Sequence, residues 1–231
     1  MVLTSKCIVK NIREIDKRLK LITFKIEKYI PWEPGMFLQL SLDKYDPSKP
    51  WPESRAFSFA SYGEDEAKIL VRKEGEFTTR LFNELKENSE FYIRYSFGEF
   101  ILSDPGDKVF IAAGTGISVF LSFIDYAIKE NIKDEIIIFH SIKNSKELIT
   151  NYIGKKIPDN IKLITHITRE KIENYPNERI QIEDILNKID ENKDYNFYIC
   201  GSDKFVKRYE SELMISKKNN IYSESWNKNF S

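Results

Sequence analysis

The hydrophobic pattern of this chain changes its period near residue 103, and this change constrains the fold more than any other feature. Before it, apolar and polar residues alternate as in half-buried strands. After it, short apolar runs alternate with longer amphipathic segments, as in strand–helix repeats. The segment Ser103-Asp104-Pro105-Gly106-Asp107 between them has turn chemistry. We therefore predict two domains, residues 1–103 and residues 104–231.

The first domain is predicted to be an antiparallel β-barrel. Six strand-like segments are separated by turn and charge clusters, and one helix is expected over about 78–87. Many short strands around a single helix are typical of such a barrel. The strands are expected over 5–11, 19–27, 36–42, 55–60, 67–73 and 90–96.

The second domain is predicted to be an α/β fold with a parallel sheet. Alternation of strand and helix implies right-handed crossovers and a sheet that is covered on both faces. Strands are expected over 108–113, 135–140, 161–167, 195–200 and 221–223, and helices over about 117–130, 145–153, 181–190 and 203–217.

Composition argues against several classes of function. Lys plus Arg and Asp plus Glu both number 36, so the chain has no net charge and no general attraction to nucleic acid. The apolar runs are too short for a membrane span and the N-terminus is too polar for a signal peptide, so we expect a cytoplasmic protein with no membrane partner. Cys7, Cys200, His140 and His166 have no metal-ligand spacing, so no metal is expected; Cys7 and both histidines are expected to be structural.

Three short motifs carry the functional signal. Arg55-Ala56-Phe57-Ser58 stands in a predicted strand, and a planar guanidinium can bind phosphate oxygens through two hydrogen bonds. Gly114-Thr115-Gly116 follows a strand and opens a helix, where glycines either admit a phosphate or allow tight packing of the helix. Cys200-Gly201-Ser202 ends another predicted strand, where a small thiol beside a glycine leaves room for a ring. The alternatives without a ligand are that residues 55–58 form an ordinary strand and that Cys200 is a buried structural cysteine.

With these motifs in this order, the chain resembles the ferredoxin–NADP reductase and flavin reductase superfamily nearly end to end. The resemblance implies that Arg55 pairs with the flavin pyrophosphate and that Ser58 lies near the flavin nitrogen that accepts hydride. Phe57 replaces the usual Tyr, which keeps ring stacking and loses a hydroxyl contact. Thr78 is expected to cap a helix whose N-terminus attracts phosphate, although an ordinary capped helix explains it equally well. The cofactor-binding residues implied in this half are Arg55, Ala56, Phe57, Ser58, Val71, Lys73, Gly75, Phe77, Thr78 and Thr79.

The resemblance also assigns roles in the second domain. Arg169 and Arg179 are expected to contact the 2′-phosphate of NADP, with Thr168 as a hydroxyl donor, or else to form a solvated loop. Glu224 is expected to assist electron or proton movement near Cys200. Val119 and Glu178 depart from the family's usual proline and glycine. The residues implied in this half are Gly114, Thr115, Gly116, Thr168, Arg169, Arg179, Cys200, Gly201, Glu224 and Trp226, with Ser58, Cys200 and Glu224 as catalytic residues.

The resemblance implies an FAD-dependent oxidoreductase that takes hydride from NADPH, or from NADH, and passes electrons to a separate acceptor. The resemblance implies a ferredoxin or flavodoxin as partner, and because the chain has no cysteine cluster for an iron–sulfur centre, a ferredoxin is expected to be a separate protein. One alternative is a reductase that uses free flavin as a loosely held substrate. Another is a flavin-binding subunit of a larger electron-transfer complex.

Overall fold

The computed structural model describes residues 3–102, 104–151, 153–154 and 156–226. Contacts within the chain divide it into two compact units. The first comprises Met1–Leu102 and Ser118–Tyr126, and the second comprises Ser103–Ile117 and Ala127–Ser231. Each unit is described by itself below.

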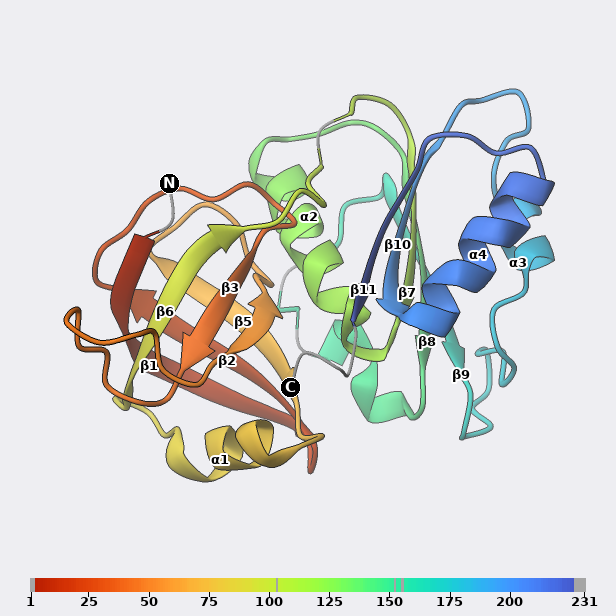
Figure 1. Cartoon of the computed structure of the whole chain (residues 1–231). Helices are drawn as coiled ribbons and strands as arrows, with labels where there is room; N and C mark the ends of the chain where they lie inside the picture. Colours follow the sequence, from red (N-terminus) through yellow and green to blue (C-terminus); the bar gives the residue numbers. More distant parts are fainter. Residues whose placement is uncertain (1–2, 103, 152, 155, 227–231) are drawn as a thin grey trace. The chain divides into compact units, whose positions relative to one another are not determined.

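The first unit contains the antiparallel barrel that the alternating pattern predicts (Figure 1). Its six strands lie in the order β4-β3-β6-β1-β2-β5. The two end strands approach each other beyond β4, because Phe59 forms an antiparallel bridge with Ile69 and the Ala60 N–H donates to Lys68 O at 2.7 Å. The elements are β1 (Leu3–Asp16), β2 (Leu19–Ile26), β3 (Phe37–Ser41), β4 (Arg55–Ser58), β5 (Glu66–Arg72), α1 (Glu76–Glu84) and β6 (Glu90–Phe97).

Alternate residues of these strands fill the barrel with apolar side chains. Cys7, Phe24 and Phe91 are fully buried, and the rings of Phe24 and Phe91 meet edge to face at 5.0 Å. Trp32 stacks on Phe59 at 4.2 Å and donates its indole N–H to Ser61 O at 3.1 Å. The strand period thus builds a continuous core, and Cys7 is part of it as expected.

The second unit contains a five-stranded sheet in the order β11-β10-β7-β8-β9, with every neighbouring pair parallel. This confirms the predicted α/β fold. The elements are β7 (Lys108–Ala113), η1 (Gly114–Gly116), β8 (Ile136–Ile142), η2 (Ser145–Glu147), η3 (Ile149–Asn151), β9 (Ile161–Ile167), α3 (Ile182–Leu186), β10 (Asn196–Ser202), α4 (Asp203–Ile215) and β11 (Ile221–Trp226).

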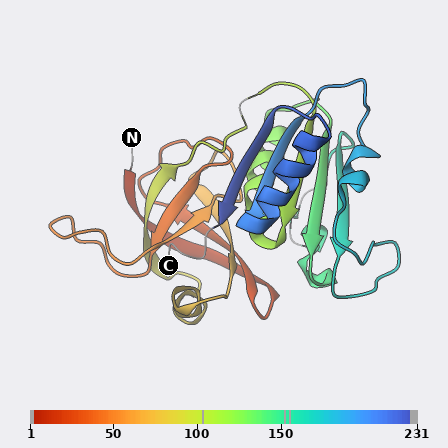
Figure 2. The same cartoon turned by 45° about the vertical axis from the view of Figure 1, so that its right-hand side comes forward.

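Helices α3 and α4 lie on the same face of this sheet (Figure 2). Val206, Tyr209 and Leu213 of α4 are buried against apolar residues of the strands, with β10 the strand most in contact. The Tyr209 hydroxyl also donates to Ile180 O at 2.6 Å, which fixes the segment that precedes α3.

The prediction of a helix over 145–153 is wrong. The structure has two 3₁₀ turns there, η2 and η3. Asn144 accepts a hydrogen bond from the Lys146 N–H, and the Asn151 amide donates to Ser145 O at 3.1 Å. Asparagine side chains that bond to nearby backbone compete with the helical ladder, which explains the interruption.

Helix α2 (Ile117–Lys129) joins the two units through the chain, because Ser118–Tyr126 groups with the barrel. The buried Ser122 hydroxyl accepts from the Gly35 N–H at 3.0 Å, and Asp125 accepts from the Tyr62 N–H at 2.9 Å. Gly35 has φ +102°, and a Cβ there would lie 2.0 Å from Phe100 O, so only glycine fits this turn.

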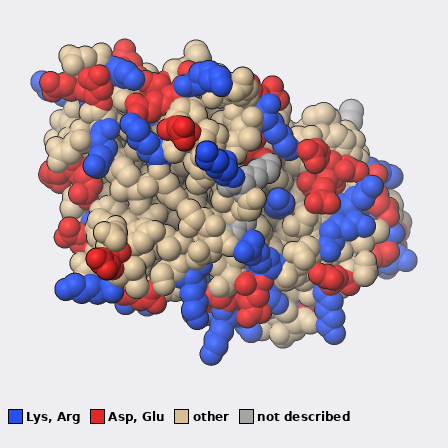
Figure 3. Space-filling view, turned by 180° about the vertical axis from the view of Figure 1, so that it is seen from behind, with Lys and Arg blue, Asp and Glu red and all other residues tan. Residues whose placement is uncertain are grey.

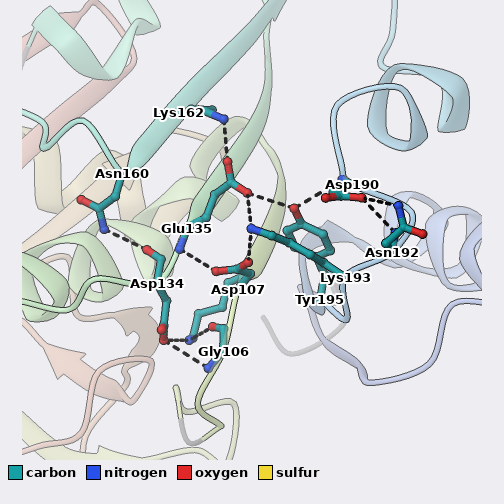
Figure 4. A network of polar contacts seen from close by, with 11 residues as sticks. Gly106, Asp107, Asp134, Glu135, Asn160, Lys162, Asp190, Asn192, Lys193 and Tyr195 are labelled. Carbon is teal, nitrogen blue, oxygen red and sulfur yellow. Dashed lines mark hydrogen bonds and ion pairs between the residues drawn. The ribbon is translucent and has the colours of Figure 1, made fainter.

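A polar network lies at the amino edge of the parallel sheet (Figure 4). Its members include the residue directly before each of four strands: Asp107, Glu135, Asn160 and Tyr195. Glu135 accepts from the Tyr195 hydroxyl at 2.9 Å and pairs with Lys162 at 2.5 Å, and Asp107 pairs with Lys193 at 2.9 Å. The network therefore ties four strand starts together at one edge of the sheet.

Candidate functional site

Arg55 stands at the start of β4, and its guanidinium lies against the protein rather than extending away from it. The group stacks over the Phe77 ring at 5.2 Å, donates to Ser54 O at 2.9 Å and pairs with Glu53 at 3.2 Å. The side chain is 28% exposed. One part of the guanidinium is therefore fixed by the protein, while the group still reaches solvent.

The residues after Arg55 alternate between the surface and the interior. Ala56 is exposed, whereas Phe57 and Ser58 are 7% and 8% exposed. Phe57 and Phe77 both belong to the barrel core. Phe57 thus helps to hold β4 on the barrel, and Phe77 supports the guanidinium of Arg55 from α1.

The turn into α1 differs from the expectation that Thr78 is its N-cap. Gly75 is the N-cap, and Thr78 is the third helical residue. The Thr78 hydroxyl reaches back and accepts from the Gly75 N–H at 3.0 Å, as the third residue of a capping box does. A Cβ at Gly75 would meet no atom within 4 Å, so the space beside the helix start is open. Thr79 is half-buried in the same first turn.

Two residues near the end of β5 are already engaged by the protein. Val71 is fully buried in the barrel core. The N–H of Lys73 donates to Arg18 O at 2.8 Å, and Lys73 O accepts two hydrogen bonds from the Arg18 guanidinium, at 2.7 and 3.0 Å. The backbone of Lys73 is therefore bound to the β1–β2 turn, and its ammonium group lies 6.0 Å from the Phe82 ring.

In the second unit, the predicted residues gather at the carboxyl edge of the parallel sheet. Gly114 follows β7, Thr168 follows β9, and Cys200 lies near the end of β10. Ligands of parallel sheets bind at this edge, opposite the polar network of Figure 4.

The Gly114–Gly116 turn is shaped largely by contacts within the protein. Gly114 has φ +54°, and its carbonyl lies 3.0 Å from Nε2 of the buried His140. A Cβ at Gly116 would lie 2.3 Å from Cys200 O, so this glycine lets the turn pack on β10. Helix α2 begins directly after the turn, at Ile117, although Val119 replaces the family's proline.

Cys200 and Glu224 are brought together as the resemblance implies. They are direct partners in the register of β10 and β11, which places their side chains on one face of the sheet. Cys200 is 1% exposed and Glu224 is half-buried. Burial raises the pKa of Glu224 to about 7. The side chain of Trp226, another residue implied by the resemblance, lies outside the described residues.

The segments that carry Arg169 and Arg179 lie beside each other. The Ile167 N–H donates to Pro176 O at 2.8 Å, and His166 Nδ1 lies 3.2 Å from Glu178 O. Both arginines are exposed. His140 and His166 are thus buried and hydrogen-bonded to backbone, as expected of structural histidines.

The hydroxyl of Thr168 differs from its expected role as a donor to phosphate. It donates to Ile142 O at 2.9 Å, so its single proton is engaged within the protein. The next two residues also join the loop after β8. The Arg169 N–H donates to Lys143 O at 3.0 Å, and Glu170 accepts from the Ser145 N–H at 2.8 Å.

Sequence reasoning missed Glu53 and Glu170. Both act on a predicted site residue through a contact, Glu53 as the ion-pair partner of Arg55 and Glu170 as the anchor of the segment that carries Arg169. An acidic residue two positions before Arg55 was a visible signal in the sequence. The contact of Glu170 with Ser145, 25 residues away, left none.

No helix in the described part of the chain is both long and apolar enough to cross a membrane.

Residues 110–211 match the family model of the oxidoreductase NAD-binding domain. The chain is 28% identical, over 205 residues, to the flavodoxin/ferredoxin–NADP reductase of Buchnera aphidicola subsp. Baizongia pistaciae, with 81% of each chain covered.

Two further proteins are similar. The flavohemoprotein of Bacillus subtilis is 25% identical over 170 residues, which are 69% of this chain and 43% of that protein. The chain therefore corresponds to less than half of that relative. A solved ferredoxin NADP⁺ reductase of Neisseria gonorrhoeae, with bound FAD and NADP, has a TM-score of 0.79 at 19% identity and covers 97% of this chain and 98% of its own. This likeness confirms the fold.

Proposed function

We propose that the chain is an NAD(P)H-dependent flavoprotein oxidoreductase of the ferredoxin–NADP reductase-like superfamily, supported by the match to the NAD-binding domain and by the similarity to the Buchnera aphidicola reductase. The barrel unit binds FAD and the α/β unit binds NADPH or NADH. The observation that carries this proposal is the carboxyl edge of the parallel sheet. This edge carries the Gly114 turn, Cys200 and the half-buried Glu224. The first two lie within residues 110–211, which match an NAD-binding domain.

The residues of the barrel unit fit a flavin that carries phosphate. Arg55 keeps a guanidinium at the surface, supported by the Phe77 ring, and the space at Gly75 beside the start of α1 is open. A guanidinium and a helix start are both favourable for phosphate. When bound, the flavin supplies the redox chemistry, and the protein supplies binding and orientation. Ser58 is the proposed hydrogen-bonding residue near the reacting nitrogen.

Cys200 and Glu224 are the proposed residues on the nicotinamide side. Hydride transfer requires the reacting atoms to approach to roughly 3–3.5 Å. Cys200 and Gly201 are small and buried near the carboxyl end of β10, and the ring is proposed to lie against this end of the strand. Glu224, with a pKa of about 7, can hold or release a proton at neutral pH.

A spectroscopic titration tests the proposal directly. Purified protein is mixed with FAD, and NADPH is then added without oxygen. We expect about one flavin per chain and loss of the flavin's visible absorption on adding NADPH. A chain that binds no flavin and oxidises no pyridine nucleotide would contradict the proposal.

Arg169 and Arg179 are the proposed contacts for the 2′-phosphate of NADPH. Hydrogen bonds between charged groups are strong, so Arg169→Ala is expected to lower kcat/KM for NADPH about tenfold or more and to affect NADH far less. Steady-state rates with the two nucleotides measure this. Lys188→Ala, which removes an exposed cation just after α3, is the matched control. Equal losses with NADPH and NADH would remove the assignment.

A separate electron carrier, ferredoxin or flavodoxin, is the proposed acceptor. The name of the Buchnera aphidicola relative supports it, since that protein matches over 81% of both chains. Two alternatives remain open: free flavin as the substrate, and a partner within a larger electron-transfer complex. Turnover with NADPH and each acceptor in turn distinguishes them.

A further inference from the structure

The phosphate-binding face proposed for Arg55 already holds an anion from the chain itself. Glu53 Oε1 lies 3.2 Å from one terminal nitrogen of Arg55. The other terminal nitrogen donates to Ser54 O, and the Phe77 ring lies 5.2 Å from the centre of the guanidinium. A flavin phosphate that binds Arg55 therefore meets a guanidinium whose exposed donors are shared with a carboxylate.

Further carboxylates surround this pair. Glu53 Oε2 also lies 3.7 Å from Arg80 of α1, and Arg80 pairs with Asp43 and Glu84, each at 2.8 Å. We call these five residues the Arg55–Arg80 cluster. It contains two guanidinium groups and three carboxylates, so it has one negative charge in excess. A phosphate that enters the cluster is attracted by Arg55 and repelled by Glu53.

We propose that Glu53 is a built-in competitor for the phosphate groups of the flavin. Its carboxylate engages Arg55 in the flavin-free chain and must give way when a phosphorylated flavin binds, so the flavin is held weakly and exchanges with solution. This inference rests on the proposed function and concerns the same site. Glu53 is 50% exposed and can turn into solvent, which makes exchange feasible without unfolding of β4.

Flavin affinity in Glu53→Gln tests the proposal. The variant keeps the size of the side chain and removes its charge. We expect FAD and FMN to bind about fivefold more tightly than to the unaltered chain, and riboflavin, which has no phosphate, to bind equally well. Quenching of flavin fluorescence measures all three dissociation constants. Glu66→Gln, at an exposed position of β5 outside the cluster, is the matched control.

Several results would overturn the proposal. These are unchanged or weaker binding of FAD to Glu53→Gln, an equal gain for riboflavin, and an equal gain in Glu66→Gln. Absence of binding of every flavin to every variant would overturn the proposed function as well. Normal flavin binding with no gain in Glu53→Gln would overturn only the present inference.

Combining Glu53→Gln with Arg55→Gln tests whether Glu53 acts through Arg55. Arg55→Gln is expected to weaken FAD binding, and adding Glu53→Gln to it should bring no further gain. A gain that persists in full in the double variant would show that Glu53 does not act through this guanidinium, and would overturn the proposal. Glu53 is a half-exposed loop residue, and circular dichroism verifies that each variant is folded.

Discussion

Glu224 shows how burial sets the chemistry of a single side chain. Its pKa is about 7, against an ordinary value of 4.5, because burial disfavours the charged form. In the unfolded chain this carboxyl ionises near pH 4.5, whereas in the folded chain it stays protonated until about pH 7. The folded state therefore loses stability as the pH rises from 4.5 to 7, and the loss is complete above that range.

The consequence can be measured with Glu224→Gln, which has no charge to bury. We expect the variant and the unaltered chain to have the same Tm at pH 4, and the variant to unfold about 7 °C or more higher at pH 8. Thermal unfolding at the two pH values checks this. Glu183→Gln, at an exposed position of α3, should show no such difference. A Glu224→Gln effect of equal size at both pH values would contradict the assignment to ionisation.

At the scale of elements, the two edges of the parallel sheet differ in the residues they carry. The amino edge is tied by charged and hydrogen-bonded side chains between the starts of four strands. The carboxyl edge carries glycines, a cysteine and turns held by backbone hydrogen bonds. We infer that the amino edge contributes to stability and leaves the carboxyl edge available for ligands.

Glu135 is the centre of the amino-edge network, and its removal tests that role. The hydrogen bond from Lys162 lowers the pKa of Glu135, so its contribution to stability is present above pH 4.5 and is lost as the pH falls through its folded pKa. Ion pairs of partly exposed groups contribute about 1 kcal/mol, so Glu135→Gln should lower Tm by about 2–4 °C at pH 7 and less at pH 3. Calorimetry at both pH values checks the difference. A larger loss at pH 3 would contradict it.

Most elements could be predicted because their signals are local. The period of two in β1 and β5 and the buried runs of β7 and β8 identify strands without knowledge of the fold. The segment 145–153 was misjudged because the side chains of two asparagines compete with the helix.

The candidate site was harder to predict, because its details depend on distant contacts. The family resemblance implied that Glu224 lies near Cys200, and the two residues are direct partners in the register of β10 and β11. The binding of Lys73 by Arg18 links residues 55 positions apart. The engagement of the Thr168 hydroxyl by Ile142 spans 26 positions. No local sequence pattern predicts contacts between residues so far apart in the chain.

At the scale of the whole molecule, the chain of α2 runs through both units. Its residues 118–126 belong to the barrel unit, while its first residue and its last three belong to the other. Ser122 and Asp125 hold backbone N–H groups of the barrel. Unfolding of α2 would leave those groups unsatisfied, so the barrel cannot lose this helix without cost.

We therefore expect the two units to unfold in a single transition. Two of the three tryptophans, Trp32 and Trp51, lie in the barrel unit, so tryptophan fluorescence reports mainly on that unit. Helical circular dichroism reports on both units, because α1 and residues 118–126 of α2 lie in the barrel unit, and α3 and α4 lie in the other. The two signals should give the same denaturant midpoint. Separate midpoints would show that α2 does not couple the units.

Lys and Arg are interspersed with Asp and Glu on the face shown in Figure 3, in keeping with the absence of net charge. Long-range electrostatic steering is therefore expected to be weak. Association with a protein acceptor should accordingly depend on local contacts and change little with salt, which rates of electron transfer at low and high ionic strength would reveal.

The missing side chain of Gly116 has a consequence for how this protein can evolve. The carbonyl of Cys200 fills the place where a Cβ at position 116 would stand. The η1 turn and the end of β10, 84 positions apart in the sequence, are thus in direct contact, and a larger residue at 116 would require one of them to move. In related sequences, an alanine at position 116 should therefore occur only together with a changed conformation at the end of β10. The Gly114–Gly116 turn and the Cys200-Gly201 motif should accordingly change together during evolution.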